Sequence, residues 1–132
     1  MKLVIGGYAQ GKLDYILREC DQEHYVIFDS KMPNAEQLQE IARQGKTVVI
    51  NHFHHWGKER ISQGENMEEE IFAFLEKSPK CVIISDEIGN GIVPVNALER
   101  EYRERVGRIL VKLAGQADEV VRVICGIGQK IK

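Results

Sequence analysis

The stretch Gly-Gly-Tyr-Ala-Gln-Gly-Lys at residues 6–12 is the part of this 132-residue chain that says most about its fold. It follows the pattern Gly-x4-Gly-Lys-Ser/Thr of phosphate-binding loops up to the last position, where Leu13 has no hydroxyl. In such a loop, backbone N–H groups and the N-terminus of the next helix hold phosphate oxygens. The lysine reaches the outer phosphates, and the Ser/Thr hydroxyl binds the magnesium ion. The sequence therefore predicts a phosphate site that lacks one metal ligand.

The residues around the loop match the context in which such loops bind phosphate. Residues 2–5 are predicted to form a strand, and Leu13, Ile16, Leu17 and Cys20 follow at helical spacing. Leu13 therefore has a packing role on a stripe that faces the sheet. The expected nucleotide contacts are Gly6, Gly7, Tyr8, Ala9, Gln10, Gly11, Lys12 and Leu13.

Short apolar runs alternate with helical patterns along the chain, which is typical of βαβ units around a parallel sheet. Strands are predicted at residues 2–5, 25–29, 47–51, 81–85 and 119–125. We predict an α/β fold of the P-loop NTPase type, a three-layer sandwich with a mostly parallel central sheet. A single nucleotide-binding P-loop domain is expected to span residues 1–132.

Three helix starts and one long helix stand out in the pattern. Asn34, Asn66 and Asn96 each precede a Gln or Glu by three residues, which is a variant of the capping box. The helix from residue 97 to about 115 carries an apolar stripe that begins at Leu98, and its arginines alternate with glutamates, as on a solvated face. Residues 53–65 are polar and contain glycine, so we expect a mobile loop there.

Asp86 and Glu87 come just after the fourth predicted strand, at the sheet edge where ligands bind in open α/β sheets. Two glycines and a proline follow, so an ordinary turn explains this stretch equally well. Beside a loop without its hydroxyl, the two carboxylates could hold magnesium or orient a substrate hydroxyl. Together with Lys12, which would stabilise the transferred phosphate, they are the predicted catalytic residues.

Three histidines, His52, His54 and His55, follow the third predicted strand. No Cys, Asp or Glu nearby has matching ligand spacing, so we predict an exposed loop cluster and no metal site. One of these histidines, or Trp56, could contact the ligand. Asn51 ends the strand at a position where phosphate-loop proteins commonly have an acid that assists magnesium. The ligand set for Mg²⁺ is therefore incomplete here as well as in the loop.

The composition excludes several classes of function. The net charge of −2 argues against nucleic-acid binding, which needs a basic face. No apolar run reaches membrane-spanning length, and the N-terminal residues do not have the pattern of a signal peptide. The three cysteines, Cys20, Cys81 and Cys125, are widely spaced and suit reduced thiols. We therefore expect a cytoplasmic protein.

The second half of the chain contains a series of short motifs. In order along the chain, they are Glu87-x-Gly-x-Gly-Ile-Val-Pro94, Asn96-x-Leu98, Gly107-Arg108, Ala117-Asp118-Glu119-Val120 and Gly126-Ile127-Gly128-x-Lys130-Ile131-Lys132. This series, with the loop at residues 6–12, resembles the adenosylcobinamide kinase/adenosylcobinamide-phosphate guanylyltransferase family of cobalamin biosynthesis. The two matches together cover over a third of the chain.

The resemblance implies ATP or GTP as a nucleotide substrate, adenosylcobinamide as the acceptor of a phosphoryl group, and a homo-oligomer, a trimer in those enzymes. The family carries its guanylylated histidine in an Arg-Ile-x-x-His motif between the second and third strands. Residues 30–46 contain no histidine, so we expect the kinase activity without the guanylyltransferase activity, unless His52, His54 or His55 has taken over that role.

Three hypotheses about function follow from these observations. The first is a kinase that phosphorylates adenosylcobinamide, and the second is a nucleotide- or corrinoid-binding protein that has lost catalysis and regulates a full-length relative. The third is a small phosphate-loop kinase with an unrelated substrate. The family resemblance favours the first hypothesis, whereas Leu13 and Asn51 favour the second.

Overall fold

The fold was analysed in a computed structural model that describes residues 1–19, 21–88 and 96–132. Cys20, which we placed on the first helix, lies outside the described residues, as do residues 89–95, which include the turn predicted after Glu87. The described strands are β1 Lys2–Gly6, β2 Tyr25–Asp29, β3 Thr47–Asn51, β4 Val82–Asp86, β5 Glu119–Ile124 and β6 Ile127–Lys130. The described helices are α1 Lys12–Glu19, η1 Gln22–His24, α2 Ala35–Arg43, α3 Phe53–Ser62, α4 Met67–Lys77 and α5 Ala97–Gln116.

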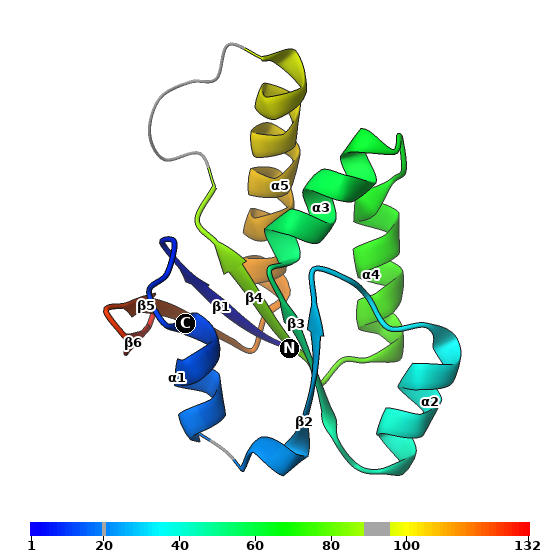
Figure 1. The fold of residues 1–132 in the computed structure, drawn as a ribbon, viewed down its shortest axis with the longest axis vertical. Helices are drawn as coiled ribbons and strands as arrows, with labels where there is room; N and C mark the ends of the chain where they lie inside the picture. Colours follow the sequence, from blue (N-terminus) through cyan, green and yellow to red (C-terminus); the bar gives the residue numbers. More distant parts are fainter. Residues whose placement is uncertain (20, 89–95) are drawn as a thin grey trace.

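The strands form one six-stranded sheet in the order β2-β3-β4-β1-β5-β6 (Figure 1). All neighbouring pairs are parallel except β5 and β6, which are antiparallel. The α/β class and the mostly parallel sheet are therefore confirmed. Because parallel strands end at the same edge, the carboxyl ends of β1, β2, β3 and β4 bring four connections together there.

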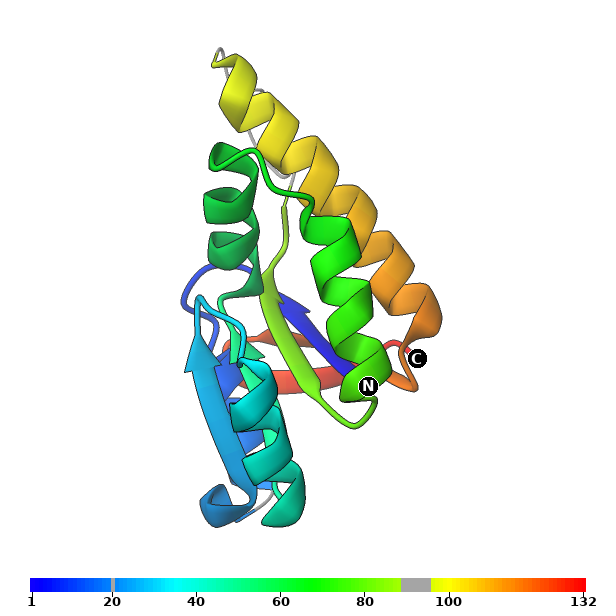
Figure 2. The ribbon, with the colours of Figure 1, turned by 90° about the vertical axis from the view of Figure 1, so that its right-hand side faces the viewer.

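Two hydrophobic clusters lie on the two faces of the sheet, because side chains alternate along each strand. One cluster contains Val4, Ile84 and Val121 from the strands, and Ile16 of α1 packs on it. The other contains Leu3, Ile50, Ile83 and Val120 together with residues of α2, α3, α4 and α5. Helix α1 thus covers one face and the other four α-helices cover the opposite face, which gives the three layers (Figures 1 and 2).

Helix α3 occupies the region that we predicted to be a mobile loop, so that prediction is wrong. Its apolar residues Phe53, Trp56 and Ile61 are buried, together with His54 and Gly57. Gly57 allows close packing, since a Cβ there would lie 2.6 Å from Cε of Met67. Buried contacts with α4 and α5 therefore hold a helix that its polar composition did not indicate.

The asparagine caps are present where we predicted them. Asn34 forms a full capping box, since its Oδ1 accepts from Gln37 N at 2.8 Å and Gln37 Oε1 accepts from Asn34 N at 2.9 Å. Asn66 and Asn96 accept backbone N–H groups at the starts of α4 and α5. The first turns of α5 project beyond the sheet (Figures 1 and 2), so Leu98, predicted on the buried stripe, is 47% exposed.

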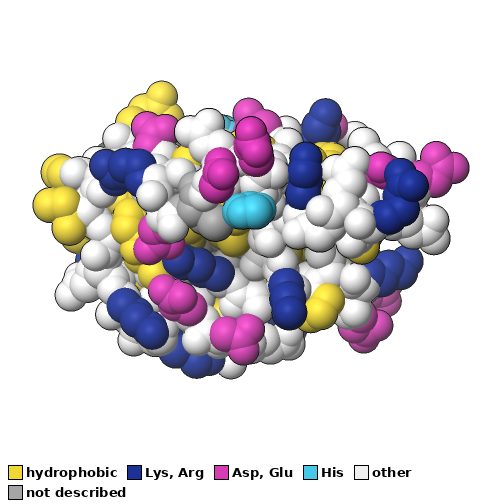
Figure 3. Space-filling view, turned by 90° about the horizontal axis from the view of Figure 1, so that it is seen from below, with side chains coloured by type: hydrophobic (Ala, Val, Ile, Leu, Met, Phe, Trp, Pro, Cys, Tyr) yellow, Lys and Arg dark blue, Asp and Glu magenta, His cyan; other side chains and the backbone are white. Residues whose placement is uncertain are grey.

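Two observations bear on nucleic-acid binding and on membrane spanning, the classes that the composition argues against. Figure 3 shows basic and acidic side chains interspersed over the face that it draws. Among the described helices, none combines the length and the apolar character needed to cross a membrane.

Candidate functional site

The loop between β1 and α1 has the strand–loop–helix arrangement that its motif requires. Strand β1 ends at Gly6 and α1 begins at Lys12. The backbone is left-handed at Ala9, with φ of 53°, and at Gly11, with φ of 83°. Glycine tolerates this conformation without steric cost. The loop therefore ends in a helix N-terminus, where free N–H groups and the helix dipole favour a phosphate.

The turn between β5 and β6 supports this loop from the far end of the chain. Gln10 accepts the backbone N–H of Cys125 with its side chain and that of Gly126 with its carbonyl, both at 2.8 Å. Arg18 of α1 donates to the carbonyl of Gly126 at 2.7 Å. Gly6 completes the fit, because a Cβ there would lie only 2.5 Å from the carbonyl oxygen of Val123. The C-terminal hairpin thus holds the loop in its shape.

Lys12 and Asp86, two of the three predicted catalytic residues, form an ion pair beneath the loop. The Lys12 ammonium lies 2.7 Å from Asp86 Oδ1 and donates to the carbonyl oxygen of Gly7 at 2.6 Å. Its side chain is only 7% exposed. The ammonium is thus held by one carboxylate and one carbonyl oxygen.

Glu87, the third predicted catalytic residue, lies elsewhere. Its carboxylate accepts from the guanidinium of Arg122 on β5, at 2.6 Å from Nε. Consecutive residues at a strand end face opposite sides of the sheet, which separates Glu87 from Asp86. The structure therefore brings Asp86 to the loop and Glu87 to Arg122.

His54 binds the other side of Asp86. The backbone N–H of Asp86 donates to His54 Nδ1 at 3.1 Å, so the ring proton sits on Nε2, which lies 3.3 Å from Asp86 Oδ2. Burial lowers the pKa of His54 from 6.5 to about 4, and His55, His52 and Lys12 add to this effect against the pull of Asp86. His54 is therefore a neutral, buried residue, and the prediction that it lies in an exposed loop is wrong.

A cavity of about 330 Å³, called here the loop cavity, opens beside these residues. The residues that line it are Tyr8, Ala9, Gln10, Gly11, Lys12, Leu13, Asp14, Asn51, His52 and Asp86. Six of the eight expected nucleotide contacts are thus among its walls. Gly7 contributes the carbonyl that Lys12 binds, and Gly6 contributes the close approach to β5.

Asn51 and His52 line the loop cavity from the end of β3, and Asp29 at the end of β2 contacts both of them. Asp29 pairs with Asn51 in the sheet register, and its Oδ1 lies 2.5 Å from His52 Nδ1. The sequence pointed to the three histidines as a group. It did not indicate that His52 would lie at the cavity while His54 is buried, because that depends on where α3 begins.

Leu13 has the packing role that its spacing predicted. Its side chain packs against the cluster that contains Val4, Ile16 and Val121. In the described part of the chain, no three His, Cys, Asp or Glu side chains come together as a metal site would require. The carboxylate of Asp86 is already paired with Lys12 and His54. These residues do not by themselves form a protein ligand set for Mg²⁺.

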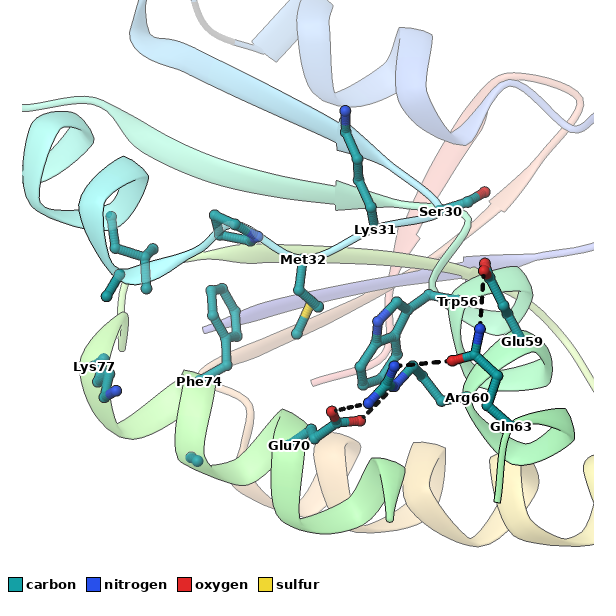
Figure 4. A pocket seen from close by; sticks show the side chains of 14 residues that line it. Ser30, Lys31, Met32, Trp56, Glu59, Arg60, Gln63, Glu70, Phe74 and Lys77 are labelled. Atoms are coloured by element: carbon teal, nitrogen blue, oxygen red, sulfur yellow. Dashed lines mark hydrogen bonds and ion pairs between the residues drawn. The ribbon is translucent and has the colours of Figure 1, made fainter. Parts of the chain in front are cut away.

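Trp56, the other candidate for ligand contact, lines a second and larger cavity of about 470 Å³. This cavity lies between the β2–α2 connection, α3 and α4 (Figure 4). Arg60 crosses its wall and is bound through Nε and Nη2 to Glu70 and through Nη1 to Gln63. Trp56 itself is buried against Phe53, with ring centroids 5.6 Å apart.

Comparisons with known proteins identify the family of the chain. The sequence profile of the family described as cobinamide kinase / cobinamide phosphate guanyltransferase matches residues 18–131, a range that begins after the loop. The bifunctional adenosylcobalamin biosynthesis protein CobU of Escherichia coli (strain K12) is 39% identical over 79 residues, which are 58% of this chain and 44% of that protein. The protein of the same name from Salmonella typhimurium (strain LT2) is 46% identical over 63 residues, 47% of this chain and 35% of that protein.

The matched part thus covers less than half the length of either relative. The family match nevertheless spans most of this chain, from the last turn of α1 to the residue before the last. The chain belongs to the cobinamide kinase / cobinamide phosphate guanyltransferase family.

Proposed function

We propose that this protein binds a nucleoside triphosphate, ATP or GTP, in the loop cavity. The loop N–H groups and the start of α1 would hold the phosphates, and Lys12 would neutralise the outer ones. The observation that carries this proposal is the Lys12–Asp86 ion pair at 2.7 Å, beside the loop that joins β1 to the N-terminus of α1. Asp86 would hold the buried ammonium in place until phosphate oxygens replace it.

The reaction proposed for this site is transfer of the terminal phosphoryl group to the hydroxyl of adenosylcobinamide. Phosphoryl transfer needs positioning and charge neutralisation more than covalent chemistry from the protein. Lys12 would stabilise the charge on the transferred group, and Asp86 would hold Lys12 and orient the incoming hydroxyl. Family membership supports this acceptor.

The guanylyltransferase activity is not part of the proposal. The connection between β2 and β3 consists of a short loop, α2 and a turn, and residues 30–46 contain no histidine. The chain has four histidines, His24, His52, His54 and His55, and the three that follow β3 are the candidates for guanylylation. Intact-mass measurement after incubation with GTP tests whether one of these three is guanylylated. An added nucleotide mass that disappears on substitution of one of them would mean that the chain has the guanylyltransferase activity.

A second candidate function rests on Leu13. Because its side chain packs against the sheet cluster and carries no hydroxyl, the loop lacks a ligand for the metal that accompanies the nucleotide. A protein of this kind could keep its affinity for nucleotide or corrinoid without turnover and act as a regulator of a full-length relative.

We further propose self-association, as a trimer by resemblance to the family. The exposed apolar side chains Val111, Ile127 and Ile131 support an interface on the side of α5 and β6. Sedimentation velocity would give the stoichiometry, and a monomer at tens of micromolar would contradict this proposal.

The kinase proposal is tested by incubating the protein with γ-labelled ATP or GTP, Mg²⁺ and adenosylcobinamide, and by following label into the corrinoid. Lys12→Ala should lower turnover by about 100-fold or more, the scale on which removal of one charge-stabilising group acts. Lys80→Ala, at an exposed lysine remote from the loop cavity, is the matched control. Nucleotide binding without turnover in the wild type would favour the regulator, and absence of binding would contradict both functions.

A further inference from the structure

Asp29 and His52 form a hydrogen-bonded pair beside the loop cavity, separate from Lys12 and Asp86. They come from the adjacent ends of β2 and β3, and His52 Nδ1 lies 2.5 Å from Asp29 Oδ1. The amide of Asn51 lies 3.4 Å from the same carboxylate oxygen and 3.3 Å from Nδ1. The hydrogen bond to Asp29 therefore fixes the orientation of the His52 ring, and the Asn51 amide donates to the same Asp29 oxygen.

The hydrogen bond to Asp29 determines which nitrogen of His52 carries the proton. A carboxylate accepts but does not donate, so Nδ1 bears the hydrogen and Nε2 keeps its lone pair. Among the described residues, Nε2 has no hydrogen-bond partner. An imidazole arranged in this way is a proton acceptor, and the carboxylate behind it stabilises the imidazolium that forms.

The backbone of His52 is in an uncommon conformation that serves this arrangement. His52 precedes α3 with φ of 53° and ψ of 47°, in the left-handed region, and its side chain makes no capping bond to the helix. That conformation costs a non-glycine residue about 1 kcal/mol. The His52 carbonyl accepts the N–H groups of His55 and Trp56 at the start of α3, while its side chain is left to bind Asp29.

Of the three histidines that follow β3, His52 is the one that can reach a ligand in the loop cavity. It lines the cavity with Lys12 and Asp86, and its side chain is 41% exposed. His54 is buried with both ring nitrogens engaged by Asp86. His55 stacks on His52, with ring centroids 5.0 Å apart, but is not among the residues that line the cavity.

We propose that His52, oriented by Asp29, is the general base of the phosphoryl transfer; this role rests on the kinase function proposed above. The acceptor hydroxyl loses its proton to Nε2 as its oxygen bonds to the terminal phosphorus. The bond from that phosphorus to the bridging oxygen breaks, and the nucleoside diphosphate leaves with that electron pair. His52 then releases the proton to solvent, to which its side chain is partly open.

The test compares His52→Ala, Asp29→Asn and the neighbouring control His55→Ala in the corrinoid phosphorylation assay. His52→Ala should lower kcat by about 100-fold or more, while the nucleotide affinity measured by calorimetry stays unchanged. Added imidazole should restore part of the lost kcat, which a purely structural role would not allow. Asp29→Asn should lower kcat by about tenfold, since it removes the orienting charge, and His55→Ala should keep the wild-type rate.

The outcomes separate this proposal from the kinase proposal. If the wild type turns over and His52→Ala is equally fast, or is slow and insensitive to imidazole, the general-base role is wrong and the kinase function stands. If the wild type binds nucleotide without turnover, the kinase function fails and the role of His52 fails with it. The side chains of His52 and Asp29 are 41% and 63% exposed, so neither His52→Ala nor Asp29→Asn opens the core. Circular dichroism checks that both variants are folded.

Discussion

Asp86 binds the His54 imidazole at both nitrogens, with its backbone N–H 3.1 Å from Nδ1 and its carboxylate 3.3 Å from Nε2. The same carboxylate holds the ammonium of Lys12 through its other oxygen. The start of α1, the end of β4 and the first turn of α3 are therefore linked through one side chain. This link places the loop lysine and is the basis of the first two predictions.

Replacement of His54 by alanine should destabilise the protein by about 2 kcal/mol, because it leaves a buried N–H without its acceptor and opens a void. Urea unfolding measures the effect. His55→Ala, at an exposed position of the same helix, should stay within about 0.5 kcal/mol of the wild type. Equal destabilisation by the two substitutions would show that the contacts of His54 with Asp86 do not stabilise the fold.

Stability should fall as the pH is lowered from about 6.5 towards 4. Burial lowers the pKa of His54 to about 4, whereas the unfolded chain titrates near 6.5, so in this window the unfolded state binds more protons. The slope for this one group is at most about 1.4 kcal/mol per pH unit. Urea unfolding at several pH values should show a weaker dependence in His54→Ala, and identical slopes would contradict the assignment.

Gly6→Ala should disrupt the loop, since the new Cβ would lie 2.5 Å from the backbone oxygen of Val123 and force β5 and the loop apart. We expect a loss of about 2 kcal/mol or more in stability, in the range of overpacking substitutions, together with loss of nucleotide binding. The control is Gly115→Ala in α5, where a Cβ meets nothing within 4 Å. That substitution should stabilise the helix by about 0.5–1 kcal/mol, and a similar loss at both sites would contradict the close-packing argument.

Leu13→Ser should make nucleotide binding more dependent on magnesium, because it supplies the missing hydroxyl at the start of α1. It should also cost about 1 kcal/mol of stability, because part of a leucine side chain leaves the sheet cluster. Calorimetric titration of ATP with and without Mg²⁺ gives the first quantity. If the wild type already depends strongly on magnesium and Leu13→Ser changes nothing, Leu13 is not the reason for an incomplete metal site.

The fold was predictable wherever local patterns and burial agreed. The five parallel strands were found within one residue of the predicted bounds at each end, and the caps at Asn34, Asn66 and Asn96 are present. Strand β6 was missed because its turn places Cys125, with φ of 50°, before Gly126, with φ of 76°, where asparagine or aspartate usually signals a hairpin. Helix α3 was missed because tertiary burial of Phe53 and Trp56 outweighs its polar composition.

The candidate site was predictable only in part, for a physical reason. Lys12 and Asp86 each follow a strand end, so a parallel sheet brings them to one edge whatever the details of the packing. The partner of Glu87 depends on the direction of its side chain, and that of His54 depends on where α3 begins. The spacing of residues along the sequence indicates neither of these. The support of Gln10 by Cys125 and Gly126 joins residues 115 positions apart and could be seen only in three dimensions.

The central claim is that residues 6–12 form a working nucleotide site built around Lys12. Isothermal titration of ATP and GTP into the wild type, Lys12→Ala and the control Lys80→Ala tests it most directly. We predict saturable binding to the wild type and the control, weakened by about tenfold or more, or about 1.4 kcal/mol, in Lys12→Ala. Absence of binding to the wild type, or equal affinity in the folded Lys12→Ala variant, would contradict the account.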